Sequence, residues 1–115
     1  MKFCRMFAGE DGKSHIEELD LAQRPDLTNM HGTKGVFFSI TAPGHFMDWH
    51  HAPRRQYVIT LSGRGEIELM GGQKVPLDPG HILLAEDTTG KGHISRGVGN
   101  EDRISLFIPL PDARD

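Results

Sequence analysis

Apolar and polar residues alternate over short stretches of this chain, and turn-forming residues interrupt them about every 8 to 12 residues. Fourteen glycines and seven prolines leave little room for helices. The alternation is clearest over residues 66–69, where glutamates that are expected to face water alternate with aliphatic residues. The pattern predicts an all-β chain of about eight short strands in a closed or double-sheet architecture, which protects the strand edges.

Several segments have more definite predicted roles. Residues 2–7 are expected to form an edge strand, and the β-branched and aromatic run 36–41 is expected to form a core strand. The glycine pair 71–72 is typical of a two-residue hairpin turn. Residues 16–27 are the exception, because their aliphatic positions fit a short helical turn. Further strands are expected at residues 57–61, 66–69, 74–77, 81–85 and 103–108.

Length and charge limit the classes of protein to which the chain can belong. Its 115 residues fit one domain with one modest core. The net charge of -3 and the lack of a basic run argue against a nucleic-acid partner. No stretch has the length and hydropathy of a membrane span, so we expect a soluble, cytoplasmic protein without a membrane partner. Cys4 cannot form an internal disulfide and is expected to be a small strand residue.

Two well-separated segments carry histidines that a β-barrel could bring to one interior point, one at His50 and His51 and the other at His93. On an unbroken strand the first two would point to opposite faces unless a bulge intervened. Six strand residues would separate His50 from Gln56 by about 20 Å, too far to share an ion. Pro53 removes that objection, because it favours a bend that would let His50 and Gln56 face each other from adjacent strands.

The glycines, histidine and glutamine of this region have the spacing Gly44-x5-His50-x-Ala52-x3-Gln56-x6-Gly63. This spacing resembles the first sequence motif of the cupin superfamily, in which Gly, His, x, His, a gap, Glu and a closing Gly follow one another. A second, looser match runs from Gly80 to His93, with Glu86 in the place of the usual proline. The two motifs cover about half of the chain.

The resemblance implies a cupin-type jelly-roll barrel, that is, a double-stranded β-helix, formed by residues 1–115 as a single domain with its barrel core at about 34–110. In cupins the two His and the Glu of the first motif, with the His of the second, typically hold a divalent metal. The resemblance therefore implies that His50, Gln56 and His93 point inward. It also implies a homodimer, for which the apolar strand at residues 103–110 would provide an edge.

The departures from the cupin pattern weaken the implied metal site. Ala52 stands where the second histidine would be, although a longer gap would make His51 that residue and Trp49 the first position, and both registers stay open. Gln56 replaces a carboxylate, and a neutral amide oxygen offsets none of an ion's charge. The metal ligands implied are His50, His51, Gln56 and His93. They would hold Zn, Fe, Ni or Mn, weakly or not at all.

Residues beside the first motif are further candidates for binding and catalysis. Arg54 and Arg55 either form a solvated bend or hold a substrate carboxylate through paired hydrogen bonds. Trp49 and Tyr57 flank the bend. Both either pack in the core or at a dimer interface or line a pocket, Trp49 as a substrate-binding residue and Tyr57 as a catalytic one.

The seven-residue polar loop 86–92 interrupts the short strand pattern and is expected to form a lid or a pocket wall. Its two acids, Glu86 and Asp87, are candidate general bases, with Asp87 the preferred catalytic candidate.

Two classes of function follow. The first is a metal-dependent enzyme that acts on a small oxygen-rich metabolite as an isomerase, lyase or dioxygenase. The second is a metal-free barrel that binds a small molecule as a sensor or accessory protein, which Ala52 and Gln56 favour. A barrel with a purely structural role is a third alternative, and it predicts no pocket.

Overall fold

The computed structural model describes residues 2–112, which form strands and two short helical turns. The strands of the first half are β1 (Phe3–Ala8), β2 (Ser14–Glu18), β3 (Phe37–Thr41), β4 (Phe46–His50) and β5 (Gln56–Ser62). Those of the second half are β6 (Arg64–Glu68), β7 (Lys74–Leu77), β8 (Ile82–Glu86), β9 (His93–Val98) and β10 (Arg103–Pro109). The helical turns are η1 (Leu21–Gln23) and α1 (Pro25–Thr28).

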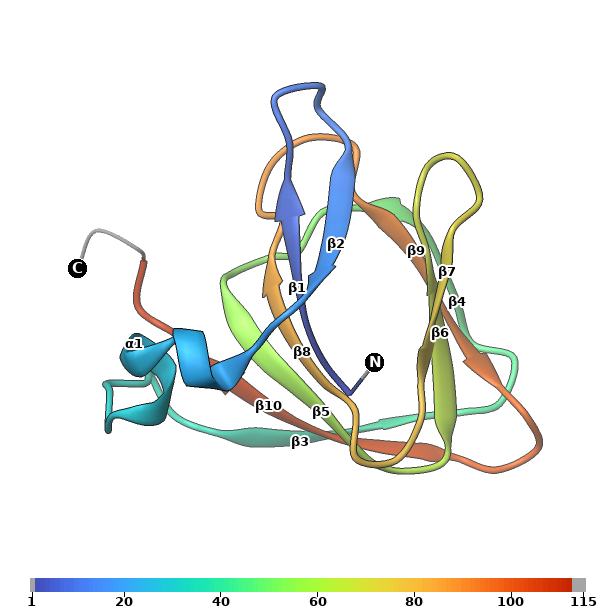
Figure 1. Cartoon of the computed structure of the whole chain (residues 1–115). Helices are drawn as coiled ribbons and strands as arrows, with labels where there is room; N and C mark the ends of the chain where they lie inside the picture. Colours follow the sequence, from blue (N-terminus) through green and yellow to red (C-terminus); the bar gives the residue numbers. More distant parts are fainter. Residues whose placement is uncertain (1, 113–115) are drawn as a thin grey trace.

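The strands form two sheets that face each other (Figure 1). The larger sheet has the order β2-β1-β8-β5-β10-β3, and the smaller has the order β4-β9-β6-β7. Neighbouring strands are antiparallel except for β1 and β8, which are parallel. This is the predicted all-β architecture with a short helical turn, and about one side chain in two on each strand points between the sheets.

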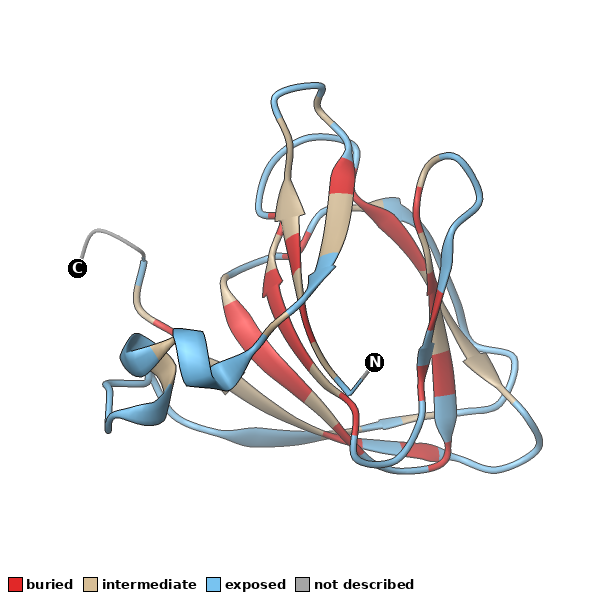
Figure 2. Ribbon diagram, viewed as in Figure 1, coloured by how far each residue is buried: buried red, intermediate tan, exposed pale blue. Residues whose placement is uncertain are grey.

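The main core lies between the two sheets. Its buried side chains come from both sheets, and Figure 2 shows the burial concentrated on the facing strands. The members are Cys4, Met6, Ala52, Val58, Ile67, Leu69, Val75, Leu77, Leu83 and Ala85. A second cluster on the outer face of the larger sheet joins Tyr57, Leu84 and Leu110 to side chains from the η1–α1 segment. That segment therefore covers one part of the sheet's outer face.

Three predictions about strand position were wrong. β1 is not an edge strand, because it pairs with both β2 and β8. β10 lies between β5 and β3, so it offers no free edge for a dimer, and the homodimer itself stays a prediction. β3 is the edge instead of a core strand, with Phe38 and Ile40 exposed by 68% and 69%. The sequence of an apolar, β-branched run does not distinguish an edge strand from a central strand, because the position of a strand depends on the strand order of the sheet.

Other local predictions were confirmed in full or in part. The hairpin between β6 and β7 turns at Gly71 and Gly72, which both have φ of 94°. The chain bends after β4, as Pro53 indicated. Residues 16–27 are only partly helical, because Ile16 belongs to β2. The glutamates of β6 were expected to face water, but their side chains are only 26% and 25% exposed, because both bond to Arg96. No described helix is long and apolar enough to cross a membrane.

Candidate functional site

Strand pairing brings His50 and His93 together between the sheets. The two residues are direct partners in the β4–β9 pair, and their ring centroids lie 4.5 Å apart. The register shifts between Met47 and His50, which marks a bulge or irregularity in this strand. His50 lines the interior cavity, whereas His51 is exposed and its Nδ1 lies 3.0 Å from the Ala52 carbonyl oxygen. Of the two histidines, His50 is therefore the one that faces inward.

Gly92 holds the two strands close at this point. It has φ of 74°, and a Cβ atom at this position would lie 1.9 Å from the His50 carbonyl oxygen. Only glycine fits such a conformation and such an approach. The polar loop that ends at Gly92 also bonds to the β1–β2 turn, where the Lys91 amide donates to the Gly12 carbonyl oxygen at 3.0 Å.

Hydrogen bonds at Nδ1 orient both imidazoles. His93 Nδ1 donates to Asp87 Oδ2 at 2.7 Å, and Ser14 Oγ donates to the same oxygen at 2.6 Å. His50 Nδ1 lies 2.7 Å from the Asp48 carbonyl oxygen, which can only accept, so this nitrogen carries the proton. In a neutral ring Nε2 is then the free acceptor, and both histidines offer it to a ligand.

Asp87 has no exposed surface, and the Ser14 and His93 bonds both end on its Oδ2. The buried Oδ1 has no hydrogen-bond partner among the described residues. Asp87 therefore contacts a ligand only through His93, as an orienting residue. Ser14 was not a sequence candidate, and no local pattern could have linked it to a residue 73 positions away.

Gln56 also faces the cavity and is only 4% exposed. It lies on β5 in the larger sheet, so it faces His50 from the other sheet and not from an adjacent strand. Its Oε1 accepts a hydrogen bond from Arg54 Nη1 at 3.0 Å. Arg54 also lines the cavity, with its guanidinium 6.0 Å from the centre of the Phe37 ring.

The cavity between the sheets has a volume of about 450 Å³, which suits a small metabolite. Its walls include three histidines, three arginines, the amide of Gln56 and several hydroxyls among apolar side chains. No aspartate or glutamate of the described chain lines it. The charged and titratable members are His45, His50, His93, Arg54, Arg96 and Arg103.

Arg103, which the sequence reasoning did not single out, is buried in this cavity at 9% exposure. Its Nε and Nη2 atoms donate to Thr60 Oγ1 at 3.2 and 2.9 Å. Burial lowers the pKa of Arg103 to about 10. Nearby, Cys4 Sγ lies 3.1 Å from His81 Nε2, and burial raises the pKa of this thiol and lowers that of His81.

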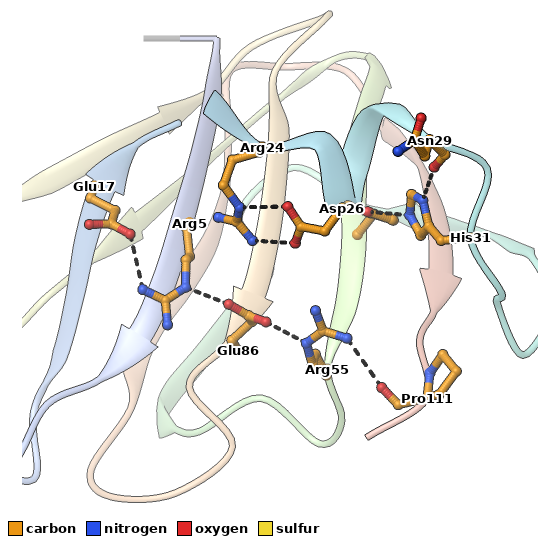
Figure 3. A network of polar contacts seen from close by, with 10 residues as sticks. Arg5, Glu17, Arg24, Asp26, Asn29, His31, Arg55, Glu86 and Pro111 are labelled. Carbon is orange, nitrogen blue, oxygen red and sulfur yellow. Dashed lines mark hydrogen bonds and ion pairs between the residues drawn. The ribbon is translucent and has the colours of Figure 1, made fainter. Parts of the chain in front are cut away.

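Three sequence candidates lie elsewhere. The Tyr57 hydroxyl donates to His31 Nε2 at 2.7 Å on the outer face of the larger sheet, and burial raises the pKa of Tyr57. Arg55 pairs with Glu86 on that face (Figure 3). Trp49 lines a surface depression together with His50, His51, Gly90 and Lys91, so His50 lines both this depression and the cavity.

Glu86 is the centre of this outer network, because Arg5 and Arg55 bind its two oxygens from opposite sides (Figure 3). Burial alone would raise the pKa of Glu86, but the two hydrogen bonds and the positive charges lower it overall. The network joins β1, β8 and the bend before β5, and Arg5, Arg55 and Glu86 are not among the described residues that line the cavity. Its arrangement is that of a structural ion-pair cluster.

Solved structures with the same arrangement of sheets place this chain among known folds. A cupin 2 conserved barrel domain protein from Salinispora arenicola aligns with a TM-score of 0.54 and 18% identity over 68% of this chain and 63% of that one. A protein with a double-stranded β-helix domain from Klebsiella pneumoniae aligns with a TM-score of 0.52 and 23% identity, over 70% and 69%. A cupin superfamily protein from Desulfitobacterium hafniense gives 0.50 and 18%, over 84% and 92%.

The chain has the cupin fold. The predicted fold class, a double-stranded β-helix, is thereby confirmed. At these identities the likeness extends to the fold and not to an activity. No protein-family model and no curated protein sequence matches the chain.

A metal centre of the cupin type does not fit the residues present. Within residues 2–112 no group of three or more His, Cys, Asp or Glu side chains is placed to hold an ion. His50, His93 and Gln56 are all neutral donors, and Arg54 places a positive charge on the Gln56 oxygen. Such a set contains no carboxylate ligand to offset the charge of a divalent ion directly.

Proposed function

We propose that this cupin binds a small, oxygen-rich metabolite in the barrel interior, with Nε2 of His50 and of His93 contacting it. The observation that carries the proposal is the His50–His93 pair, which lines a cavity of about 450 Å³ and has both Nδ1 atoms committed to other oxygens. Free Nε2 atoms at a cavity wall accept hydrogen bonds from hydroxyl groups.

Catalysis by proton transfer is the reaction type that this arrangement favours. A histidine whose Nδ1 donates to a buried carboxylate has a fixed orientation, and the carboxylate favours positive charge on the ring. His93 with Asp87 has this arrangement, which supports an isomerase or lyase that moves one proton of the bound metabolite through His93 Nε2. A sensor or carrier would use the same contacts without the proton transfer.

A metal-dependent activity is the alternative that the fold suggests, and no step of the proposal uses an ion. Elemental analysis of protein expressed untagged in medium with Fe, Mn, Ni, Co and Zn tests it. A stoichiometric ion that is lost in His93→Ala would favour the metal-dependent enzyme over the metal-free site.

A metabolite screen with two readouts tests the proposed function. Sugars, hydroxy acids and keto acids that raise the melting temperature should also shift the ¹⁵N signals of His50 and His93 Nε2. The His93→Gln variant should lose the stabilisation, whereas His51→Gln, a change on the outer surface, should retain it. Stabilisation that is equal in both variants, without a shift at either ring, would exclude the interior site.

A further inference from the structure

Within residues 2–112, the guanidinium of Arg103 is a buried positive charge without a negative partner. Arg103 is 9% exposed, and its hydrogen bonds in the described chain go to the neutral hydroxyl of Thr60. A buried charge without a counter-charge is costly, and folded proteins seldom retain one without a use for it. Here the use is expected on the cavity side, since Arg103 lines the cavity.

Other arginines of the molecule are paired with carboxylates. Arg96 also lines the cavity, but it bonds to Glu66 at 2.7 Å and to Glu68 at 3.0 Å. Arg5 and Arg55 share Glu86. These three are less buried than Arg103 and yet have carboxylates. Arg54 also lacks a carboxylate, but it is exposed, so among the described residues Arg103 is the arginine that is both buried and without one.

The surroundings of Arg103 suit an anion. Two of the five guanidinium N–H groups bind Thr60 and leave three for a ligand. Across the strands Arg103 pairs with Thr41, which also lines the cavity, as does Ser39 two residues before it. These hydroxyls can donate further hydrogen bonds to an anion that the guanidinium binds. No described acid lines the cavity with them.

We infer that Arg103 is the binding site for a carboxylate group of the cavity's ligand. The inference rests on the proposed function and adds the chemical class of the metabolite, a carboxylic acid. A planar guanidinium with two free parallel N–H groups matches the two oxygens of a carboxylate. At the buried Arg103 position one positive charge balances the single negative charge of a carboxylate, whereas Arg54, the exposed cavity arginine without a carboxylate, bonds to Gln56.

Strand geometry adds a constraint on the length of this acid. The Arg103 side chain passes over Gly65, where an added Cβ would lie 3.0 Å from its Cδ, and Gly65 is the partner of Gly97 on β9. His93 lies four residues along the same strand, or about 13 Å at the backbone. One ligand that reaches both Arg103 and His93 therefore has its carboxylate and its hydroxyl groups at opposite ends.

The test uses benzoate and benzamide, which have the same shape but differ in charge, and inorganic phosphate as a second anion. Calorimetric titration of the whole wild-type protein should give an affinity for benzoate at least about tenfold above that for benzamide and for phosphate. Arg103→Met should lose this preference and remain at least as resistant to urea. Arg64→Met, which removes an exposed arginine outside the cavity wall, should keep the preference.

Gly65→Ala provides a second variant that leaves the charge in place. The added methyl should displace the guanidinium and weaken benzoate more than benzamide. A ligand preference that survives in Arg103→Met, or equal affinities of the wild type for benzoate and benzamide, would overturn the inference. So would tighter binding of phosphate than of benzoate.

Two results separate this inference from the proposed function. If benzamide or a neutral sugar shifts the His93 signal and benzoate has no advantage, the carboxylate assignment fails and the interior site stands. If no metabolite shifts the His50 and His93 signals while the benzoate preference is present and is lost in Arg103→Met, the proposed function fails and the carboxylate site stands. If benzoate has no advantage either, both fail.

Discussion

The two ends of the cavity handle polar groups in opposite ways. At the histidine end, Ser14, Asp87, His93 and His50 are joined by short hydrogen bonds and strand pairing, and each ring has its Nδ1 partner within the protein. At the arginine end, the partner of the Arg103 guanidinium among the described residues is the neutral hydroxyl of Thr60. The first end is organised before any ligand arrives, whereas the second is completed by one.

This difference indicates which groups of the cavity are expected to determine specificity and affinity for the ligand. Preorganised donors and acceptors select a ligand by geometry, because they need no rearrangement. An unpaired buried charge selects a ligand of opposite charge, since a neutral ligand does not offset the desolvation cost of the buried charge. The four predictions that follow test the contrast, from the largest expected effect to the smallest.

Gly92→Ala should break the histidine end. The methyl group would overlap the His50 carbonyl oxygen and require a left-handed residue, so we expect a loss of about 3 kcal/mol in the free energy of unfolding. Urea unfolding measures the loss, and the shifts of the His50 and His93 rings report their separation. The His81 signal at the other end should change little.

Gly72→Ala is the matched control for backbone strain. This residue also has positive φ, of 94°, but an added Cβ would meet nothing within 4 Å. Strain alone should cost about 1 kcal/mol. Equal losses in Gly92→Ala and Gly72→Ala would mean that the close approach of the two strands contributes nothing.

Asp87→Asn should loosen the histidine end without separating the strands. The amide cannot accept from Ser14 and His93 at one oxygen as strongly as a carboxylate, and its NH₂ group is buried, so we expect a loss of about 2 kcal/mol. Ser14→Ala removes one hydroxyl donor and should cost about 1 kcal/mol. Long-range ¹H–¹⁵N spectra should show His93 in exchange between tautomers in Asp87→Asn only. A single, unchanged His93 tautomer in that variant would show that Asp87 does not orient the ring.

The residues of the histidine end could be predicted from the sequence far better than Arg103 at the arginine end. His50 and His93 each belong to a motif that is contained in a short segment of the sequence. Pro53 indicates the bend that follows β4. Positive-φ glycines such as Gly63 and Gly80 are likewise local signals for turns. These features sufficed for the fold class and for the cavity wall around His50, Gln56 and His93.

What the sequence could not supply depends on strand order and on distant contacts. β3 and β10 have similar apolar composition, and only the order of the larger sheet makes one an edge. Arg103 begins a strand as an ordinary polar residue would, and its burial follows from Thr60 and Gly65 on other strands. Tyr57 and Gln56 are neighbours in sequence, yet they face opposite sides of the sheet.

Arg103→Met should leave stability unchanged or increase it near neutral pH, because it removes an unpaired buried charge. The folded-state pKa of Arg103, about 10, is below the unfolded value, so the unfolded chain binds more protons above that pH. The cost of the buried charge is therefore fully present below pH 10 and decreases as the pH rises through it. Urea unfolding of both proteins from pH 8 to 11 should show their difference narrowing, with Tyr57 and Cys4 titrating alike in each. A difference that stays constant with pH would mean that the guanidinium is not desolvated.

The smallest expected effect is at His81, which reports the charge at the arginine end. Burial lowers the pKa of His81, and the positive charge of Arg103 lowers it further. Removing that charge in Arg103→Met should therefore raise the His81 pKa, because the imidazolium no longer faces a second cation. NMR titration of the His81 ring measures this, and benzoate bound to the wild type should produce a shift in the same direction by neutralising Arg103. A His81 pKa that responds to the substitution but not to benzoate would place the bound carboxylate away from Arg103. The substitution therefore tests whether the Arg103 charge acts on His81, and benzoate tests whether that charge binds a carboxylate.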